Sequence, residues 1–267
     1  MGNCATVAIT GEWSIEVNTP NRDRLLEAVE QRFVSGQGFS LATLNLDHVV
    51  KLRASAAFRR AYAAQTFVVA DGNPIVWLSR LSNRPVELTP GSEMVAPLAA
   101  AAACRGIPVA LVGSRDHVLA AAAERLEAAH PGLEIVSRIS PRWGFDPEGP
   151  EADACIEALR RSGARLVFLA LGAPKQEVFA ARAQAALPGC GLASIGAGLD
   201  FIAGSQRRAP LWMRRLALEW LWRALTDPRR LAHRYWRCAR LLPGLALEAL
   251  RQRGAPATAE AEALQQA

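Results

Sequence analysis

Short apolar and β-branched runs alternate along the chain with Ala-rich segments whose apolar positions follow helical spacing. This alternation is typical of parallel strands joined by crossover helices. The pattern predicts strands near residues 39–46, 65–70, 107–113, 133–139, 164–172 and 191–198. It predicts helices near residues 47–63, 92–105, 116–130, 151–162 and 175–186, and again at the C-terminal end. We therefore expect an α/β fold, with a Rossmann-like, mostly parallel sheet and flanking helices.

Positive charge is concentrated near the C-terminal end of the sequence. The formal net charge is +6 over 267 residues, and the first two hundred residues are close to neutral. Residues 205–240 hold Glu219 and Asp227 against ten arginines, a local excess of +8: Arg207, Arg208, Arg214, Arg215, Arg223, Arg229, Arg230, Arg234, Arg237 and Arg240. The shift predicts a core at residues 1–204, a basic helical appendage at 205–253, and a low-complexity, disordered tail at 254–267.

The appendage sequence 211–225 fits an amphipathic helix. On a helical wheel Arg215, Glu219 and Arg223 share one narrow strip, while apolar residues, tryptophans included, fill most of the remainder. Such a helix suits packing on the core together with an interface at the lipid headgroups. An ordinary buried helix explains the apolar arc but leaves the arginines of 229–240 unexplained. Anionic lipid, or the diphosphates of a donor and an acceptor, explains them.

Several kinds of site are disfavoured by the sequence. The five cysteines are scattered without a C-x-x-C pair, and the four histidines lack metal-ligand spacing, so we expect neither a disulfide framework nor a metal, and a reducing cytoplasm fits best. The chain contains no G-x-x-x-x-G-K-[ST] loop, no G-x-G-x-x-G after the first predicted strand, no G-x-S-x-G and no D-x-D pair. No signal peptide or spanning helix is predicted.

Glycine and short polar residues follow five of the six predicted strands. They are Thr43, Asn45, Asp47 and His48; Asp71, Gly72 and Asn73; Gly113, Ser114 and Arg115; the turn 172–177; and Gly196, Gly198 and Asp200. Ligands of open α/β sheets bind at the carboxyl ends of the strands, and backbone N–H groups at helix N-termini bind phosphate. Each residue alone is compatible with an ordinary turn or cap. Their convergence predicts a nucleotide or nucleotide-sugar pocket.

A set of motifs resembles a known family. The stretches "TLNLDHVVKLR", "VVADGNPIVWLSRL", "GSEM", "VALVGS", "RWGFD", "LGAPKQE" and "GAGLDFIAGSQRRAPLWMRRLALEW" occur in the order found in the bacterial WecG/TagA/CpsF glycosyltransferases. The resemblance spans about residues 38–240. It implies transfer of a sugar, such as N-acetylmannosamine, its uronic acid, glucose or glucuronic acid, from a UDP donor to a lipid-diphosphate-linked acceptor in surface-polysaccharide synthesis.

The resemblance also implies roles for individual residues. It places Thr43 and Asn45 in the catalytic pocket and makes Asp71 the general base. Inverting transfer needs a base that removes the proton of the acceptor hydroxyl, and a carboxylate at a strand end is suited to that task. The alternative is that Asp71 caps the following helix, since Asp-Gly-Asn-Pro also fits a turn with Pro in the first helical turn.

Further residues are predicted to bind substrate. In the turn 172–177, Gly172 and Pro174 shape the backbone, Gln176 is expected to bond uracil or sugar, and Glu177 to hold a ribose hydroxyl or to complement the helix dipole. The predicted substrate-binding set comprises Gly72, Asn73, Gly113, Gly172, Pro174, Gln176, Glu177, Gly198, Asp200, Arg207, Arg208 and Arg214. Two positions depart from the family pattern, with Leu88 in place of an Arg and Glu93 in place of an Asp. Arg84 or an appendage arginine is the expected replacement for that Arg.

The sequence thus favours a metal-independent hexosyltransferase without cofactors, bound peripherally to the cytoplasmic face of the plasma membrane. A nucleotide-sugar-binding module without activity and a basic nucleic-acid-binding protein stay open as alternatives, but nucleic acid leaves the strand-end pocket unused. The donor sugar, the acceptor glycan and homo-oligomerisation are also left open.

Overall fold

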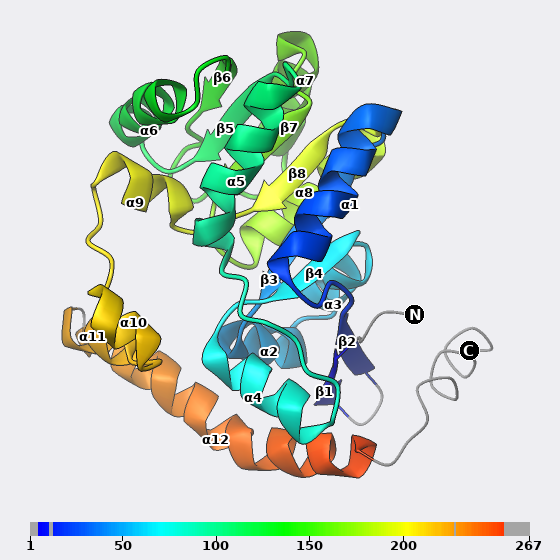
Figure 1. The fold of residues 1–267 in the computed structure, drawn as a ribbon, viewed down its shortest axis with the longest axis vertical. Coiled ribbons are helices and arrows are strands. Elements are labelled where there is room, and N and C mark those ends of the chain that lie inside the picture. The colour runs from blue at the N-terminus through cyan, green and yellow to red at the C-terminus, as the bar shows by residue number, and fades with distance from the viewer. Residues whose placement is uncertain (1–4, 11–12, 227, 254–267) are drawn as a thin grey trace.

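The computed structural model describes residues 5–10, 13–226 and 228–253, and its centre is a six-stranded sheet (Figure 1). All neighbouring strands of this sheet run parallel, in the order β4-β3-β8-β7-β5-β6. The strands are β3 (Phe39–Leu44), β4 (Phe67–Ala70), β5 (Val109–Gly113), β6 (Ile135–Ile139), β7 (Leu166–Ala170) and β8 (Gly191–Ser194). Each lies within a predicted run, so the expectation of an α/β fold with a parallel sheet is confirmed.

Helices cover both faces of this sheet. Along the core they are α1 (Arg22–Ser35), α2 (Leu46–Ala54), α3 (Ala56–Ala63), α4 (Asn73–Leu81), α5 (Gly91–Cys104), α6 (Asp116–Ala129), α7 (Pro150–Ser162), α8 (Lys175–Ala186) and α9 (Gly198–Ala203). The appendage forms α10 (Leu211–Arg215), α11 (Glu219–Thr226) and α12 (Pro228–Gln252). A two-stranded antiparallel hairpin, β1 (Ala5–Thr10) and β2 (Trp13–Val17), forms a separate small sheet that packs against the core.

The alternation of side chains along the strands assigns the helices to the two faces. On one face Leu41, Leu111 and Phe168 pack with α1, α5, α6 and α9. On the other, Val112 and Leu169 pack with α7 and α8. The same face of β3 and β4 carries a separate apolar cluster shared with α2, α3, α4, α12 and the hairpin. Both faces of the strands are therefore buried, as expected for a parallel sheet.

Two predicted helices are interrupted. The segment 47–63 contains α2 and α3, because Ser55 ends the first and its hydroxyl accepts the N–H of Phe58 to begin the second. The prediction of a single amphipathic helix at 211–225 is wrong, because the chain turns between α10 and α11, where Ala217 has a φ of 61°. The wheel drawn for that segment therefore does not describe one continuous face.

The appendage is built onto the core. Helix α12 contacts α2, α4 and β1, and runs beneath them in Figure 1. Its Cys238, Leu245 and Ala249 are buried in the cluster that includes Leu44 and Val49. The boundary at Gly204 stays a prediction, and the predicted tail lies outside the described residues. Within the described residues, no helix is long and apolar enough to cross a membrane.

Candidate functional site at the carboxyl ends of the strands

Two adjacent strands bring Thr43 and Asp71 together. Strands β3 and β4 are paired in register, with Thr43 opposite Val69 and Leu44 opposite Ala70. The N–H of Asp71 donates to the carbonyl of Leu44 at 2.7 Å, which extends the ladder by one residue. The hydroxyl of Thr43 donates to Asp71 Oδ2 at 3.3 Å. Thr43 is buried and Asp71 is half-buried, so the carboxylate stands at the edge of the core.

The backbone after Asp71 bears on whether this residue caps the following helix. Helix α4 begins at Asn73, and the residue in the cap position is Gly72, with a φ of 117° and a ψ of 137°. Pro74 follows in the first turn. Backbone N–H groups in a first turn have no acceptor within the helix, so the absence of an N–H in proline costs no hydrogen bond there. Asp71 therefore lies before the cap position, and the alternative that it caps α4 is not supported. The positive φ of Gly72 is one that L-residues rarely adopt.

Asn45 has a structural function in the described fold. It is the N-cap of α2, and its side-chain oxygen accepts the N–H of His48 at 3.1 Å. The predicted catalytic contact of Asn45 stays a prediction. Gly91, at the start of α5, approaches the same corner of the sheet, because a Cβ at this position would come within 2.9 Å of Thr43 Cγ2 and 3.1 Å of the Ser194 carbonyl. Gly91 thus permits the close approach of α5 to the end of β3.

Gln176 and Glu177 are built into the turn that follows β7. Gln176 Oε1 accepts the N–H of Gly172 at 3.2 Å, and its Nε2 donates to Glu177 Oε1 at 2.9 Å. Burial raises the pKa of Glu177 to about 7, although the Gln176 hydrogen bond lowers it in part. Both side chains are buried and organise the turn, whereas Gly172 and Pro174 are exposed at its tip. Ligand contacts of these four residues stay predictions.

The segments that follow β5 and β8 meet at Asp200, which lies in α9. The hydroxyls of Ser114 and Ser205 donate to Asp200 Oδ1 at 3.3 and 3.1 Å. Gly113 and Gly198 are required by packing, since a Cβ would come within 2.5 Å of the Ala170 backbone at the first and 2.9 Å of Val95 at the second. The sheet topology thus brings the predicted strand-end residues to one edge, while close packing also explains these two glycines.

Appendage arginines reach the start of α5. Arg208 and Arg214 lie 2.7 and 3.2 Å from Glu93 Oε1, and the Arg208 guanidinium stacks over the Phe201 ring. Glu93, one of the two departures from the family pattern, therefore holds the appendage against the core. Leu88, the other departure, has a side chain that is 41% exposed. Its backbone forms an isolated parallel β-bridge with Ala70, the residue before Asp71. Arg207 is exposed.

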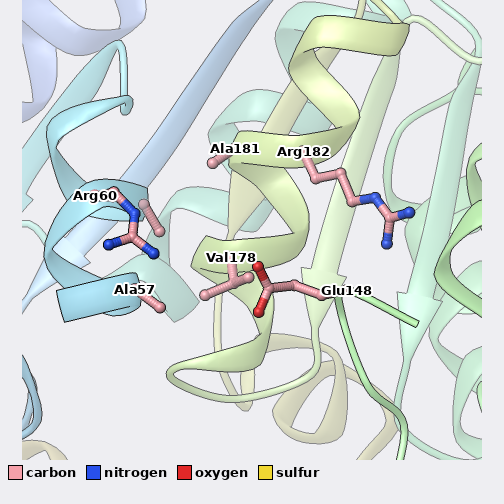
Figure 2. A pocket seen from close by; sticks show the side chains of 7 residues that line it. Ala57, Arg60, Glu148, Val178, Ala181 and Arg182 are labelled. Carbon is pink, nitrogen blue, oxygen red and sulfur yellow. The ribbon is translucent and has the colours of Figure 1, made fainter. Parts of the chain in front are cut away.

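A shallow groove of about 370 Å³ lies between α3 and α8 (Figure 2). Arg60 and Ala57 line it from α3, and Val178, Ala181 and Arg182 from α8, with Glu148 on the loop before α7. Arg182 is already paired with Asp153. The groove contains none of the residues predicted to bind substrate.

Some residues near the site were not identified as functional from the sequence. His48 was noted only as a strand-end residue, and Tyr62, which contacts both His48 and Thr43, lies in a helix that gives no local signal. Lys51 Nζ donates to the Ala173 carbonyl at 3.0 Å and lies 2.8 Å from Asp47. The contacts of Tyr62 with Thr43 and of Lys51 with Ala173 join residues distant in sequence, so periodicity and motif spacing do not reveal them.

The carboxyl edge of the sheet, where open α/β sheets bind their ligands, carries a carboxylate, a buried hydroxyl and arginines. A family model described as the glycosyl transferase WecG/TagA/CpsF family matches residues 12–257. The chain belongs to this glycosyltransferase family. Family membership implies a nucleotide-sugar donor and an acceptor.

Proposed function

We propose that this protein transfers a hexose-type sugar from a UDP donor to a lipid-diphosphate-linked acceptor, with inversion at the anomeric carbon. The main support for this proposal is the position of Asp71, which follows β4 and precedes the N-cap of α4. The Thr43 hydroxyl donates a hydrogen bond to Asp71 Oδ2 at 3.3 Å. In this proposal Asp71 removes the proton of the acceptor hydroxyl as that oxygen attacks the sugar. The bond to the diphosphate breaks, and UDP departs with its electron pair.

Arginines supply the charge that a departing diphosphate requires. Arg208 and Arg214 lie at the start of α5 through their pairing with Glu93, and Arg207 lies exposed beside them. Positively charged groups placed where negative charge develops stabilise the transition state. In this proposal they replace the Arg that the family pattern has at the position of Leu88, and the reaction uses neither a metal nor a cofactor.

Because the proposed acceptor is linked to a lipid, the appendage is proposed to bind a membrane surface. Exposed apolar side chains lie along α10 to α12: Trp212, Leu216, Trp220, Leu225, Trp236, Leu247 and Leu250. Exposed Arg237 and Arg240 accompany them on α12. Tryptophan and arginine together suit the headgroup region of anionic lipid. We therefore propose peripheral attachment to the cytoplasmic face of the plasma membrane, in the service of surface-polysaccharide synthesis.

The test begins with a thermal-shift panel of UDP-sugars, because a ligand that binds only the native state raises the melting temperature. The sugars are UDP-linked N-acetylmannosamine, N-acetylmannosaminuronic acid, glucose and glucuronic acid. The stabilising donor is then incubated with a polyprenyl-diphosphate-linked sugar, and released UDP and glycosylated lipid are quantified. Equal amounts of both products support the proposal. Donor binding without either product identifies a non-catalytic binding module, and salt-sensitive binding to duplex DNA without donor binding favours the nucleic-acid alternative.

A further inference from the structure

A buried polar cluster lies directly beneath the Thr43–Asp71 pair. Tyr62, on α3, places its hydroxyl 3.2 Å from the Thr43 carbonyl, to which it donates. His48, in the first turn of α2, places Nδ1 2.6 Å from the same hydroxyl. Tyr62 is 2% exposed and His48 6% exposed, so solvent does not compete for these bonds. Each polar group of the cluster therefore finds its hydrogen-bond partner within the cluster.

The directions of these hydrogen bonds follow from counting protons. Tyr62 has one hydroxyl proton, and it is used on the Thr43 carbonyl. With that proton on the carbonyl, the 2.6 Å contact is made by the Nδ1–H tautomer of His48, in which the imidazole donates to the phenol oxygen. Burial, reinforced by the charge of Lys51, lowers the pKa of His48 to about 3, and the ring is neutral at physiological pH. A neutral imidazole with its proton on Nδ1 satisfies both contacts.

The bonds continue to the carboxylate through Thr43. Its carbonyl is held by Tyr62, and its hydroxyl donates to Asp71 Oδ2 at 3.3 Å. Phe58 encloses the two rings, with its centroid 5.1 Å from that of Tyr62 and 5.9 Å from that of His48. The rings are thus fixed by packing and the polar atoms by hydrogen bonds. Packing of this kind keeps a functional group in one geometry.

We propose that Tyr62 and His48 are positioning residues, which hold the Thr43 carbonyl from within the core and thereby fix the Thr43 hydroxyl against Asp71. This inference rests on the proposed function for its effect on turnover. Neither residue touches the exposed edge of the site, so both act through Thr43. Small displacements of a catalytic group lower turnover more than substrate binding.

The first test is Tyr62→Phe, which removes the hydroxyl and keeps the ring. We expect kcat to fall roughly tenfold while KM for the donor stays within about twofold. The matched control is Leu245→Ala, a buried position of the same apolar cluster on α12, which removes no polar atom. It is expected to lower the melting temperature at least as much as Tyr62→Phe and to leave kcat within about twofold. A kcat loss that follows the melting temperature in both variants overturns the proposal.

A double-mutant cycle tests whether Tyr62 acts through Thr43. In a Thr43→Val background the hydroxyl that faces Asp71 is absent, so Tyr62→Phe is expected to reduce the residual kcat by less than about twofold. An equal fold loss in both backgrounds contradicts the mechanism. For His48, Asn keeps an N–H near the position of Nδ1 and Leu does not. His48→Asn is expected to retain several-fold more activity than His48→Leu, and equal losses count against a positioning bond.

A structural readout keeps this inference separate from the proposed function. Crystal structures of the wild-type chain and of Tyr62→Phe are compared at the Thr43–Asp71 pair. We expect the hydrogen bond between Thr43 Oγ1 and Asp71 Oδ2 to be present in the wild type and lost in the variant. An unchanged pair overturns the positioning role whatever the activity. Absence of wild-type transfer with every donor overturns the proposed function alone, since the structural comparison still decides the positioning role.

Discussion

Arg234 of the appendage lies 3.1 Å from Asp47, a residue in the first turn of α2. The second oxygen of Asp47 lies 2.8 Å from Lys51 Nζ, and Lys51 in turn donates to the Ala173 carbonyl at 3.0 Å. Although burial acts to raise it, the Lys51 hydrogen bond and the charges of Arg234 and Lys51 hold the pKa of Asp47 below its ordinary value. Two ion pairs and one hydrogen bond thus connect α12 with the turn that carries Gln176.

Arg234→Gln is expected to lower the free energy of unfolding by about 1 kcal/mol, measured by denaturant titration near neutral pH. The pair contributes stability above the unfolded pKa of Asp47, because the folded pKa is depressed, and this contribution is lost as pH falls through the folded pKa. The difference between wild type and variant should therefore shrink on acidification. Arg240→Gln, at an exposed position on the same helix, is the control and should change stability little. Equal effects of the two variants contradict a structural role for Arg234.

The position of Arg234 also changes the set of arginines expected to contact lipid. The arginines of 229–240, predicted to contact anionic lipid or diphosphate, include Arg234, but the structure pairs Arg234 with the core, while Arg237 and Arg240 are exposed. Replacing both exposed arginines with Gln should weaken binding to anionic vesicles by about 1 kcal/mol per charge, as measured by cosedimentation. Turnover with a soluble acceptor analogue should change little. Vesicle binding equal to that of the wild type argues against this surface.

Glu177→Gln is expected to make the protein less sensitive to alkaline pH. The folded pKa of Glu177, about 7, is raised above its ordinary value of 4.5, so its stability contribution is fully present below 4.5 and is lost as pH rises through 7. The stability of the Gln variant relative to wild type should therefore increase between pH 5 and pH 8, since each pKa unit corresponds to about 1.4 kcal/mol. Glu124→Gln, on the exposed surface of α6, is the control. A relative stability that stays constant with pH contradicts the burial argument.

Much of the fold is readable from the sequence, because buried parallel strands give continuous apolar runs that differ clearly from helical spacing. Other elements were not predicted. Helix α1 carries Leu25, Val29 and Phe33 on one buried face between an Asn21 cap and Gly36, a pattern with helical spacing that is present in the sequence. The hairpin of β1 and β2 and helix α4 were also not predicted.

The candidate site was predictable in part. Thr43 lies near the end of β3 and Asp71 follows β4, so the rule that ligands bind at the carboxyl ends of parallel strands places both at one edge. The sequence does not show that β3 and β4 are neighbours, which brings the two side chains into contact. The contacts of Tyr62 with Thr43 and of Arg234 with Asp47 join residues far apart in the chain, and a single sequence carries no signal for them. Glu177, predicted to hold a ribose hydroxyl or to complement the helix dipole, is buried in the first turn of α8, and its ligand contact stays a prediction.

Incubation with EDTA is expected to leave transfer unchanged, because arginines and backbone N–H groups are proposed to balance the charge of the departing UDP. Initial rates of UDP release are compared before and after chelation and gel filtration. Added Mg²⁺ or Mn²⁺ should then have little effect. A rate that collapses on chelation and returns with either metal would show that the charge balance proposed here is wrong.

The most direct test of the central claim is the turnover of Asp71→Asn, measured as UDP release in the presence of the lipid-diphosphate acceptor. Removal of a general base usually costs about 10²–10⁴-fold, and we expect a loss in that range. The dissociation constant for UDP should stay within a few-fold of the wild-type value, because the base acts on the acceptor and not on the nucleotide. Turnover within a few-fold of the wild type, in a variant that binds UDP normally, would contradict the assignment of Asp71 as the base.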